Sequence, residues 1–459
     1  MTEKVILREK IGYGFGDAAS SMFWKIFSIF LPIFYTDVFG ISAAAVGTML
    51  LVTRIWDTSN DPFMGVLCDR TNTRWGKFRP YLFWVAIPFG LIGVLMFTTP
   101  DLGLSGKLVY AYVTYTLMMM AYTAINVPYA SLLGVMSPKS NDRTSFASYR
   151  MVFAFAGSIL VVLIYQPLVD WFKTSFSEAT SYQFTMIIVG MIAVFFFLLT
   201  FSWTRERISP PKEQKNNLKE DIKNLLGNIP WFILLGAGVA TLIFNSVRDG
   251  VALYYFKYYV IDEAAITFSA TTLTYSTAYL FLGQTTNMFG VIMAQPVSKF
   301  LGKRNTFMYA MFGAAVLSAL FYFADSNNLW LIYTLQAIIS FCAGIIFPLL
   351  WSMYADAADY SQWKSGRRAT GLVFSASSMS QKLGWTIGGS ITLWLLAYYG
   401  FEANVVQSHE TITGIKYMMS FVPGAAALIS GLTIMFYQLS DEKMEGIIAE
   451  LEEKRKSEL

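Results

Sequence analysis

Residues 50–68, LLVTRIWDTSNDPFMGVLC, place one arginine and two aspartates inside an apolar stretch that runs from about Ser42 to Cys68. Hydrophobic residues make up 55% of the chain and charged residues 14%, whereas soluble proteins carry about 25% charged residues. Apolar blocks of about 20 residues, long enough for a helix to cross a bilayer, recur along the whole sequence. We therefore expect an all-α polytopic membrane protein.

Twelve transmembrane helices are predicted, at residues 11–37, 42–67, 80–99, 108–136, 145–169, 182–203, 230–260, 266–298, 305–323, 329–355, 369–398 and 415–437. A hydrophilic stretch between the sixth and the seventh of these helices divides them into two groups of six. We expect an N-terminal six-helix bundle at 1–203, a linker at 204–229, a C-terminal six-helix bundle at 230–439 and a tail at 440–459. The loop CDRTNTRWGKFRP after the second helix has a basic counterpart, SKFLGKRNTF, after the eighth, which suggests internal repetition.

The distribution of basic residues indicates the orientation in the membrane. Most of the 34 Lys and Arg residues lie in the two termini and in loops on the same side as the termini. The opposite loops hold Lys107, Lys173, Lys257 and Lys416. The positive-inside rule therefore places both termini in the cytoplasm. Because the polar start MTEKVILREK has no cleavable signal, we expect a multi-pass protein of a bacterial cell membrane, with membrane lipid as a partner and no nucleic acid.

The charges of the second helix lie close to the middle of the membrane. At 100° per residue, Arg54, Asp57 and Asp61 fall within about a 60° arc, and Asn60 adjoins it. A charge at this depth costs at least ~2.5 kcal/mol and marks ion or substrate pathways. Pro62 also leaves a backbone carbonyl without its helical donor. Oxygen ligands of this kind suit Na⁺ or a shared proton; the alternative is a structural ion pair between Arg54 and Asp57.

Other helices bring polar side chains to a similar depth. They are Asp17, Ser21 and Lys25 in the first helix, Tyr122, Thr123 and Asn126 in the fourth, Arg248 and Asp249 in the seventh, and Lys382 in the eleventh. Polar groups from both halves at one depth are typical of a substrate site between structural repeats. Alternatively, Asp17 pairs with Lys25 along one helix, and Lys382 neutralises an aspartate of the second helix.

The predicted cytoplasmic loops carry charges of both signs. They include Asp69, Arg70 and Arg74 after the second helix, and Asp356, Asp359 and Arg368 after the tenth. Salt bridges between such loops can close the cytoplasmic side in one state and break in another, so we predict a gate here. The alternative is that the cations only fix topology and bind anionic lipid.

The sequence resembles the glycoside-pentoside-hexuronide:cation symporters over nearly the whole chain. The resemblance rests on five motifs, which occur in the order RIWDTSNDP, TRWGKFRP, NVPYASL, YADAADYSQWKSGRRATG and QKLGWTIGG. The resemblance implies the major facilitator fold and import of a sugar or glycoside with Na⁺, H⁺ or Li⁺, without any cofactor. It also implies that the coupling cation binds at Asp57, Asn60, Asp61 and Thr123, and that Arg150 and Lys382 lie near the sugar and cation sites.

The chain departs from the melibiose carriers of that family. Where those carriers have sugar-binding aspartates, this sequence has Ser21 and Asn126, and Ala130 replaces a sugar-stacking tryptophan. Asp17, one turn before Ser21, is a candidate for the missing carboxylate. We therefore expect a xyloside, a glucuronide or a short oligosaccharide, bound by Asp17, Ser21, Lys25, Asn126, Arg150 and Lys382.

Other functions remain open at this point. They are efflux or exchange of sugars or drugs, facilitated transport in which Lys25 replaces the coupling ion, and a receptor that transports nothing. A membrane-embedded glycosyltransferase would need a catalytic carboxylate or a metal at the interface and a nucleotide-sugar loop, and neither is visible. We expect a transporter, not an enzyme, with no obligate protein partner.

Overall fold

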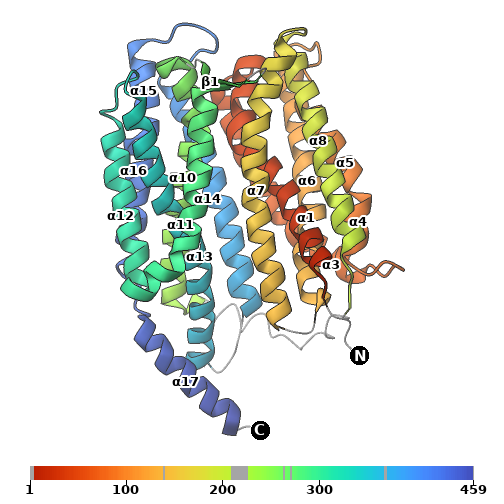
Figure 1. Ribbon diagram of the computed structural model, residues 1–459, viewed down its shortest axis with the longest axis vertical. Coiled ribbons are helices and arrows are strands. Elements are labelled where there is room, and N and C mark those ends of the chain that lie inside the picture. The colour runs from red at the N-terminus through yellow and green to blue at the C-terminus, as the bar shows by residue number, and fades with distance from the viewer. Residues whose placement is uncertain are drawn as a thin grey trace. The chain divides into compact units, whose positions relative to one another are not determined.

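The computed structural model describes residues 5–137, 140–207, 226–261, 264–268, 271–365 and 370–457. The chain divides into two compact units, which we describe separately (Figure 1). Unit 1 comprises Met1–Lys212, Asp262–Phe281 and Leu396–Gln407, and unit 2 comprises Glu213–Ile261, Leu282–Leu395 and Ser408–Leu459. Two segments from the second half of the sequence thus belong to unit 1.

Unit 1 is built mainly from the first six predicted helices. The first is continuous but changes its winding, as α1 (Leu7–Lys25), η1 (Ile26–Phe30), α2 (Leu31–Ile33) and η2 (Phe34–Val38), where η marks π-helix. The others are α3 (Ala43–Arg70), α4 (Arg79–Trp84) with α5 (Ala86–Met96), α6 (Leu104–Met136), α7 (Ser140–Lys173) and α8 (Glu178–Trp203).

Close packing of α1 against α7 and α8 forms the centre of unit 1. Gly157 of α7 lies directly against α1, because a Cβ atom there would be 2.4 Å from the carbonyl oxygen of Ala18. Only a residue without a side chain lets the two backbones approach this closely. This contact brings Asp17 of α1 and Arg150 of α7 within reach of each other.

Unit 2 contains the remaining helices. They are α10 (Ile229–Tyr255) with η3 (Phe256–Val260), α11 (Tyr275–Leu301), α12 (Lys303–Phe321), α13 (Leu329–Ser365), α14 (Thr370–Tyr398), α15 (His409–Met419) with α16 (Phe421–Ile434), and α17 (Asp441–Ser457). The first residues of α11 and the last of α14 belong to unit 1. In unit 2, α10 and α12 both pack against α16.

All twelve predicted ranges contain helix in the described part of the chain. Among the described residues, seven helical segments are long and apolar enough to cross a membrane. The prediction that a helix starts at residue 266 is wrong: β1 (Ala264–Phe268) and β2 (Thr271–Thr274) form an antiparallel hairpin before α11. The threonine-rich stretch favours strand, because β-branched side chains fit an extended backbone better than a helix. The tail predicted from residue 440 contains helix α17, whose Met444, Ile447 and Leu451 are buried.

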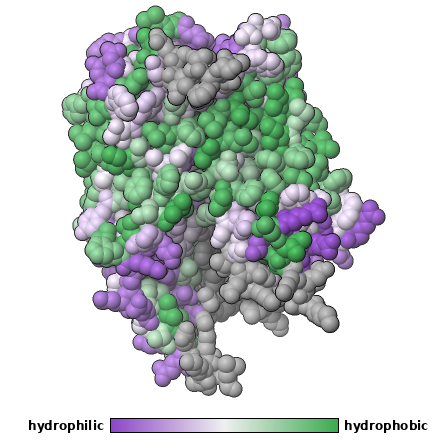
Figure 2. Space-filling model, viewed as in Figure 1, coloured by the Kyte–Doolittle hydropathy of each residue, from purple (hydrophilic) through white to green (hydrophobic). Residues whose placement is uncertain are grey.

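The outer surface of the helices has the pattern expected in lipid. Ile87, Leu91 and Leu95 follow one another at four-residue spacing on α5 and are 55%, 60% and 45% exposed. Figure 2 shows hydrophobic residues gathered at mid-height of the face in view and hydrophilic residues toward the helix ends. Large exposed apolar surfaces are rare in soluble proteins. The helices therefore present them to the hydrocarbon of a membrane.

Candidate functional site

The buried carboxylate of Asp57 is held at the middle of unit 1. Asp57 lies halfway along α3, about 21 Å from Ala43 at 1.5 Å per residue, and it is 1% exposed. The Thr123 hydroxyl of α6 donates a 2.8 Å hydrogen bond to Oδ1 of Asp57. Such a bond to an ionised group is about twice as strong as a neutral one. The structure thus brings together two of the four residues predicted for the cation site.

The other two predicted cation ligands lie on the same helix. Asn60 is half-buried one turn after Asp57. The backbone of Asp61 is helical, and its side chain lies outside the described part of the chain. Membership of Asn60 and Asp61 in the cation site therefore remains a prediction.

Arg54, on the same helix, has aromatic partners from two neighbouring helices. Its Nε donates to the hydroxyl of Tyr115 at 3.0 Å, and its guanidinium lies 4.5 Å from the centre of the Trp24 ring. It is 8% exposed and lies within electrostatic range of Asp57. Cation–π contacts strengthen when the cation is desolvated. Arg54 therefore connects α3 to α1 and α6 while its charge offsets that of Asp57.

A second polar cluster lies where α1, α6 and α7 meet. Asp17 accepts a 2.7 Å hydrogen bond from Nε of Arg150 in an ion pair. The Arg150 guanidinium also lies 5.3 Å from the ring centre of Tyr129, which stacks on Tyr13 with 4.7 Å between centroids. In addition, the Tyr129 hydroxyl donates to the carbonyl of Tyr13 at 2.7 Å. The sequence did not indicate this Asp17–Arg150 pairing.

Asn126 of α6 contacts α1 through Ser20. The Ser20 hydroxyl donates to Oδ1 of Asn126 at 2.7 Å, and Nδ2 of Asn126 donates to the carbonyl of Tyr122 at 3.0 Å. Ser20 was not predicted as a site residue; its neighbour Ser21 was, and it is half-buried. The two serines are 100° apart around the helix. The spacing of polar residues alone does not decide between them.

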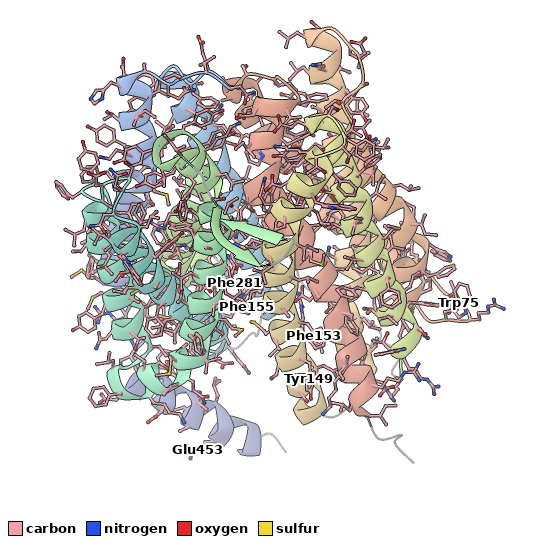
Figure 3. All side chains as sticks on the ribbon, turned by 45° about the horizontal axis from the view of Figure 1, so that its top comes forward. Trp75, Tyr149, Phe153, Phe155, Phe281 and Glu453 are labelled. Atoms are coloured by element: carbon pink, nitrogen blue, oxygen red, sulfur yellow. The ribbon has the colours of Figure 1, made fainter. Side chains whose placement is uncertain are left out.

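Tyr122 lies within electrostatic range of residues from both clusters of unit 1. These residues are Asp17 and Arg150 in one cluster and Arg54 and Asp57 in the other. The ring centre of Tyr122 is 5.9 Å from that of Trp24. Figure 3 labels Tyr149 and Phe153, one turn apart on α7 beside Arg150.

The predicted lysines lie in different units. Lys25 is the last residue of α1, where the winding changes to the π-helix η1, and it is half-buried. Lys382 lies in the middle of α14 in unit 2 and is also half-buried. π-Helical turns occur frequently at functional sites. Roles of both lysines in binding remain predictions.

Arg248 of α10 holds unit 2 together. Its guanidinium donates to Oε1 of Gln336 at 2.5 Å and to the carbonyl of Met419 at 3.3 Å, and it lies over the ring of Phe321. The residue is 7% exposed. It therefore joins α10 to α12, α13 and α15. These contacts favour a structural role for Arg248.

In unit 1, Glu206 fixes the loop between α3 and α4, which contains Trp75 (Figure 3). Its carboxylate accepts backbone hydrogen bonds of 2.8 to 2.9 Å from Lys77, Phe78 and Arg79. Gly76 has φ +108°, and a Cβ atom there would be 2.3 Å from Cδ of Glu206. Glycine is required because it tolerates positive φ and leaves room for the carboxylate.

Unit 2 repeats this arrangement in the loop between α11 and α12. Gly302 has φ +79°, and the next backbone N–H, of Lys303, donates to Oδ2 of Asp441 at 3.1 Å. Asp441 follows α16 and begins α17, as Glu206 follows α8. Arg304 donates to the carbonyl of Met435. The two loops thus share a glycine, a backbone cradle and a carboxylate, in agreement with the repetition suggested by the sequence.

A contact that matches that of Arg304 occurs in unit 1, where the Arg79 guanidinium donates to the carbonyl of Phe201 at 2.7 Å.

Two predicted gate residues have partners within their own unit. Asp356 pairs with Lys303 at 2.7 Å, and Arg74 lies over the ring of Trp75 at 4.8 Å.

The other gate candidates are less defined. Arg70 is exposed at the end of α3, and Asp359 is half-buried in α13. Arg368 and the side chain of Asp69 lie outside the described part of the chain. A gate formed by these residues remains a prediction.

The profile of the family described as MFS/sugar transport protein matches residues 12–441. The putative glycoside/cation symporter YagG of Escherichia coli (strain K12) is 36% identical, over 98% of this chain and 95% of that protein. The isoprimeverose transporter of Lactiplantibacillus pentosus is 34% identical, over 98% and 92%. The glucuronide carrier protein homolog of Escherichia coli (strain K12) is 31% identical, over 99% and 98%.

Solved structures of transporters share the fold. The nucleoside transporter NupG aligns with a TM-score of 0.63 at 11% identity, over 94% of this chain and 100% of that one. A bacterial homolog of the human lysosomal transporter Spinster, in an inward-facing conformation, aligns with a TM-score of 0.68 at 11% identity, over 95% and 98%. Together with the family profile, these alignments confirm the predicted major facilitator fold, and the curated relatives confirm the resemblance to glycoside:cation symporters.

Proposed function

Because the chain belongs to the MFS/sugar transport protein family, whose members are membrane transporters and not enzymes, we propose that it imports a glycoside, pentoside or hexuronide by symport with Na⁺ or H⁺. The names of the relatives support this proposal, since they include a putative glycoside/cation symporter, an isoprimeverose transporter and a glucuronide carrier homolog. Alternating access of two halves around a site at mid-membrane is the general mode of such carriers.

The observation that carries the proposal is the buried Asp57 with its bond from Thr123. A carboxylate that is 1% exposed at the middle of a membrane helix is costly, and such residues mark ion or substrate pathways. In the proposed cycle, a monovalent cation or a proton binds to Asp57 beside Arg54 each time a sugar is carried. In the proposed site, Asn60 and Asp61 add oxygen atoms one turn further along the same helix.

The second cluster is the proposed sugar site. Asp17, Arg150 and Asn126 offer hydrogen-bond donors and acceptors next to aromatic rings, a combination that suits the hydroxyls and apolar faces of a sugar. Ser21 and Lys25 complete the proposed set within unit 1, and a role of Lys382 of unit 2 in binding the sugar is proposed from the sequence alone. Because Tyr122 lies within electrostatic range of both clusters, the clusters are close to each other. In this proposal, neutralisation of Asp57 by the cation changes the field in which the sugar binds. This is a physical route for coupling within unit 1.

The test is uptake into proteoliposomes that contain the purified protein. A panel of glycosides is offered with an inward Na⁺ gradient, with an inward proton gradient, and with neither. The proposal predicts that one of the gradients drives accumulation above the external concentration. Equal uptake in all three conditions would mean a facilitator without coupling, and net exit under an inward cation gradient would mean an exporter.

A further inference from the structure

The Asp17–Arg150 pair carries an inference about which glycosides bind. We propose that Asp17 determines specificity: its carboxylate occupies the guanidinium of Arg150 as an internal counter-anion, so the site selects neutral glycosides over uronides. This inference rests on the proposed function, because it assumes that a glycoside binds beside this pair.

The guanidinium of Arg150 is engaged on an edge and on a face. Nε donates to Oδ2 of Asp17 at 2.7 Å, and one face lies 5.3 Å from the ring centre of Tyr129. Tyr129 is in turn fixed by its stacking on Tyr13 and by its hydrogen bond to the carbonyl of Tyr13. The side chains of Asp17 and Arg150 are 16% and 35% exposed. The pair is therefore held in place and is still accessible to a ligand.

A neutral polyol can bind to the hydrogen-bond donors and acceptors of Asp17 and Arg150 that the ion pair itself does not use. Arg150 has further N–H donors besides Nε, and a carboxylate accepts more than one hydrogen bond. A sugar hydroxyl both donates and accepts, so it can bond to the two residues without separating them. Asn126, which contacts α1 through Ser20, adds an amide of the same dual character.

A uronate carboxylate meets the opposite situation. To bind Arg150 it must displace Asp17 or stay beside it as a like charge, which is unfavourable at low dielectric. Arg54 does not offer a substitute, because it is 8% exposed and engaged with Tyr115 and Trp24. Lys25 lies eight residues further along the same helix than Asp17, which is about 12 Å at 1.5 Å per residue. Its ammonium group is therefore not next to a carboxylate that binds at Arg150.

The experiment compares two ligands of nearly equal shape, 4-nitrophenyl β-D-glucopyranoside and 4-nitrophenyl β-D-glucuronide. Each competes for uptake of a labelled neutral glycoside by wild-type protein, by Asp17→Asn and by Asp17→Asn/Arg150→Gln. Asp37→Asn is the matched control, because it makes the same change in the same continuous helix, in the segment η2 at the other end. Thermal unfolding in detergent checks that each variant is folded.

Wild-type protein is expected to bind the glucoside at least tenfold more tightly than the glucuronide. Asp17→Asn is expected to reduce this ratio about tenfold, equal to about 1.4 kcal/mol, because the glucuronide then binds relatively better. In the double variant this improvement in glucuronide binding is expected to be lost, because the Arg150 guanidinium is gone. Asp37→Asn is expected to leave the ratio unchanged.

Equal binding of the two ligands by wild-type protein would overturn the inference and leave the proposed function standing, whether or not the variants fold. A parallel change of both affinities in Asp17→Asn would also overturn it. Failure of wild-type protein to bind or transport any glycoside would refute the proposed function itself, and the inference with it.

Discussion

Replacing Thr123 with valine removes one hydroxyl from α6 and keeps the branched shape of the side chain. The lost bond is the 2.8 Å donation to Oδ1 of Asp57, between residues that are 2% and 1% exposed. A hydrogen bond to a charged group contributes about 1.5–3 kcal/mol, and each 1.4 kcal/mol is tenfold in affinity. If Thr123 orients Asp57 for a coupling Na⁺, the Na⁺ concentration that gives half-maximal uptake rises roughly tenfold to 150-fold. For a coupling proton the half-maximal concentration falls instead, because a hydrogen bond donated to the carboxylate favours its ionised form and the variant lacks that bond.

The assay is glycoside uptake by proteoliposomes at a series of coupling-ion concentrations. Thr114→Val is the matched control, since Thr114 is a buried threonine of the same helix and its hydroxyl donates to the carbonyl of Tyr110 at 2.8 Å. We expect the control to keep the wild-type ion dependence. Wild-type ion dependence in a folded Thr123→Val variant would refute the reasoning.

Three further predictions concern stability, each measured by thermal unfolding of the purified protein. Gly76→Ala forces a Cβ atom against Glu206 at positive φ and lowers the unfolding temperature, whereas Gly134→Ala, inside helix α6 with open space around its Cβ position, does not lower it. Glu206→Gln weakens three backbone bonds to a charged acceptor and costs at least about 1.5 kcal/mol; an unchanged unfolding temperature would contradict the cradle. Asn404→Ala removes the amide that donates to the carbonyl of Asp37 at 2.6 Å and costs about 0.5–1.5 kcal/mol, and no loss would show that water replaces it.

The main helices could be predicted because hydropathy, and the depth of a residue along a membrane helix, can both be read directly along the chain. Apolar blocks identified the helices, and the cost of a carboxylate at the centre of one of them predicted a functional role for Asp57. The hairpin before α11 was missed, because a long hydropathy window merges short strands with the apolar helix that follows.

The contacts between helices needed the structure. The choice between Ser20 and Ser21 depends on the rotation of α1 against α6, which the spacing of residues within one helix does not contain. The Asp17–Arg150 pair depends on how closely Gly157 lets α7 approach α1. The cradle around Glu206 is made by backbone N–H groups. Nearly every residue has such a group, so the sequence does not show which of them bind a carboxylate.

If Asp57 couples the cation to the sugar, Asp57→Asn separates coupled from uncoupled transport. The measurement compares, in the same proteoliposomes, accumulation of glycoside driven by a cation gradient with exchange of glycoside at equal concentrations on both sides. We expect the variant to lose accumulation and to retain exchange, because asparagine keeps the shape of the side chain and removes its charge. Accumulation at the wild-type level in the variant would show that Asp57 does not couple the cation.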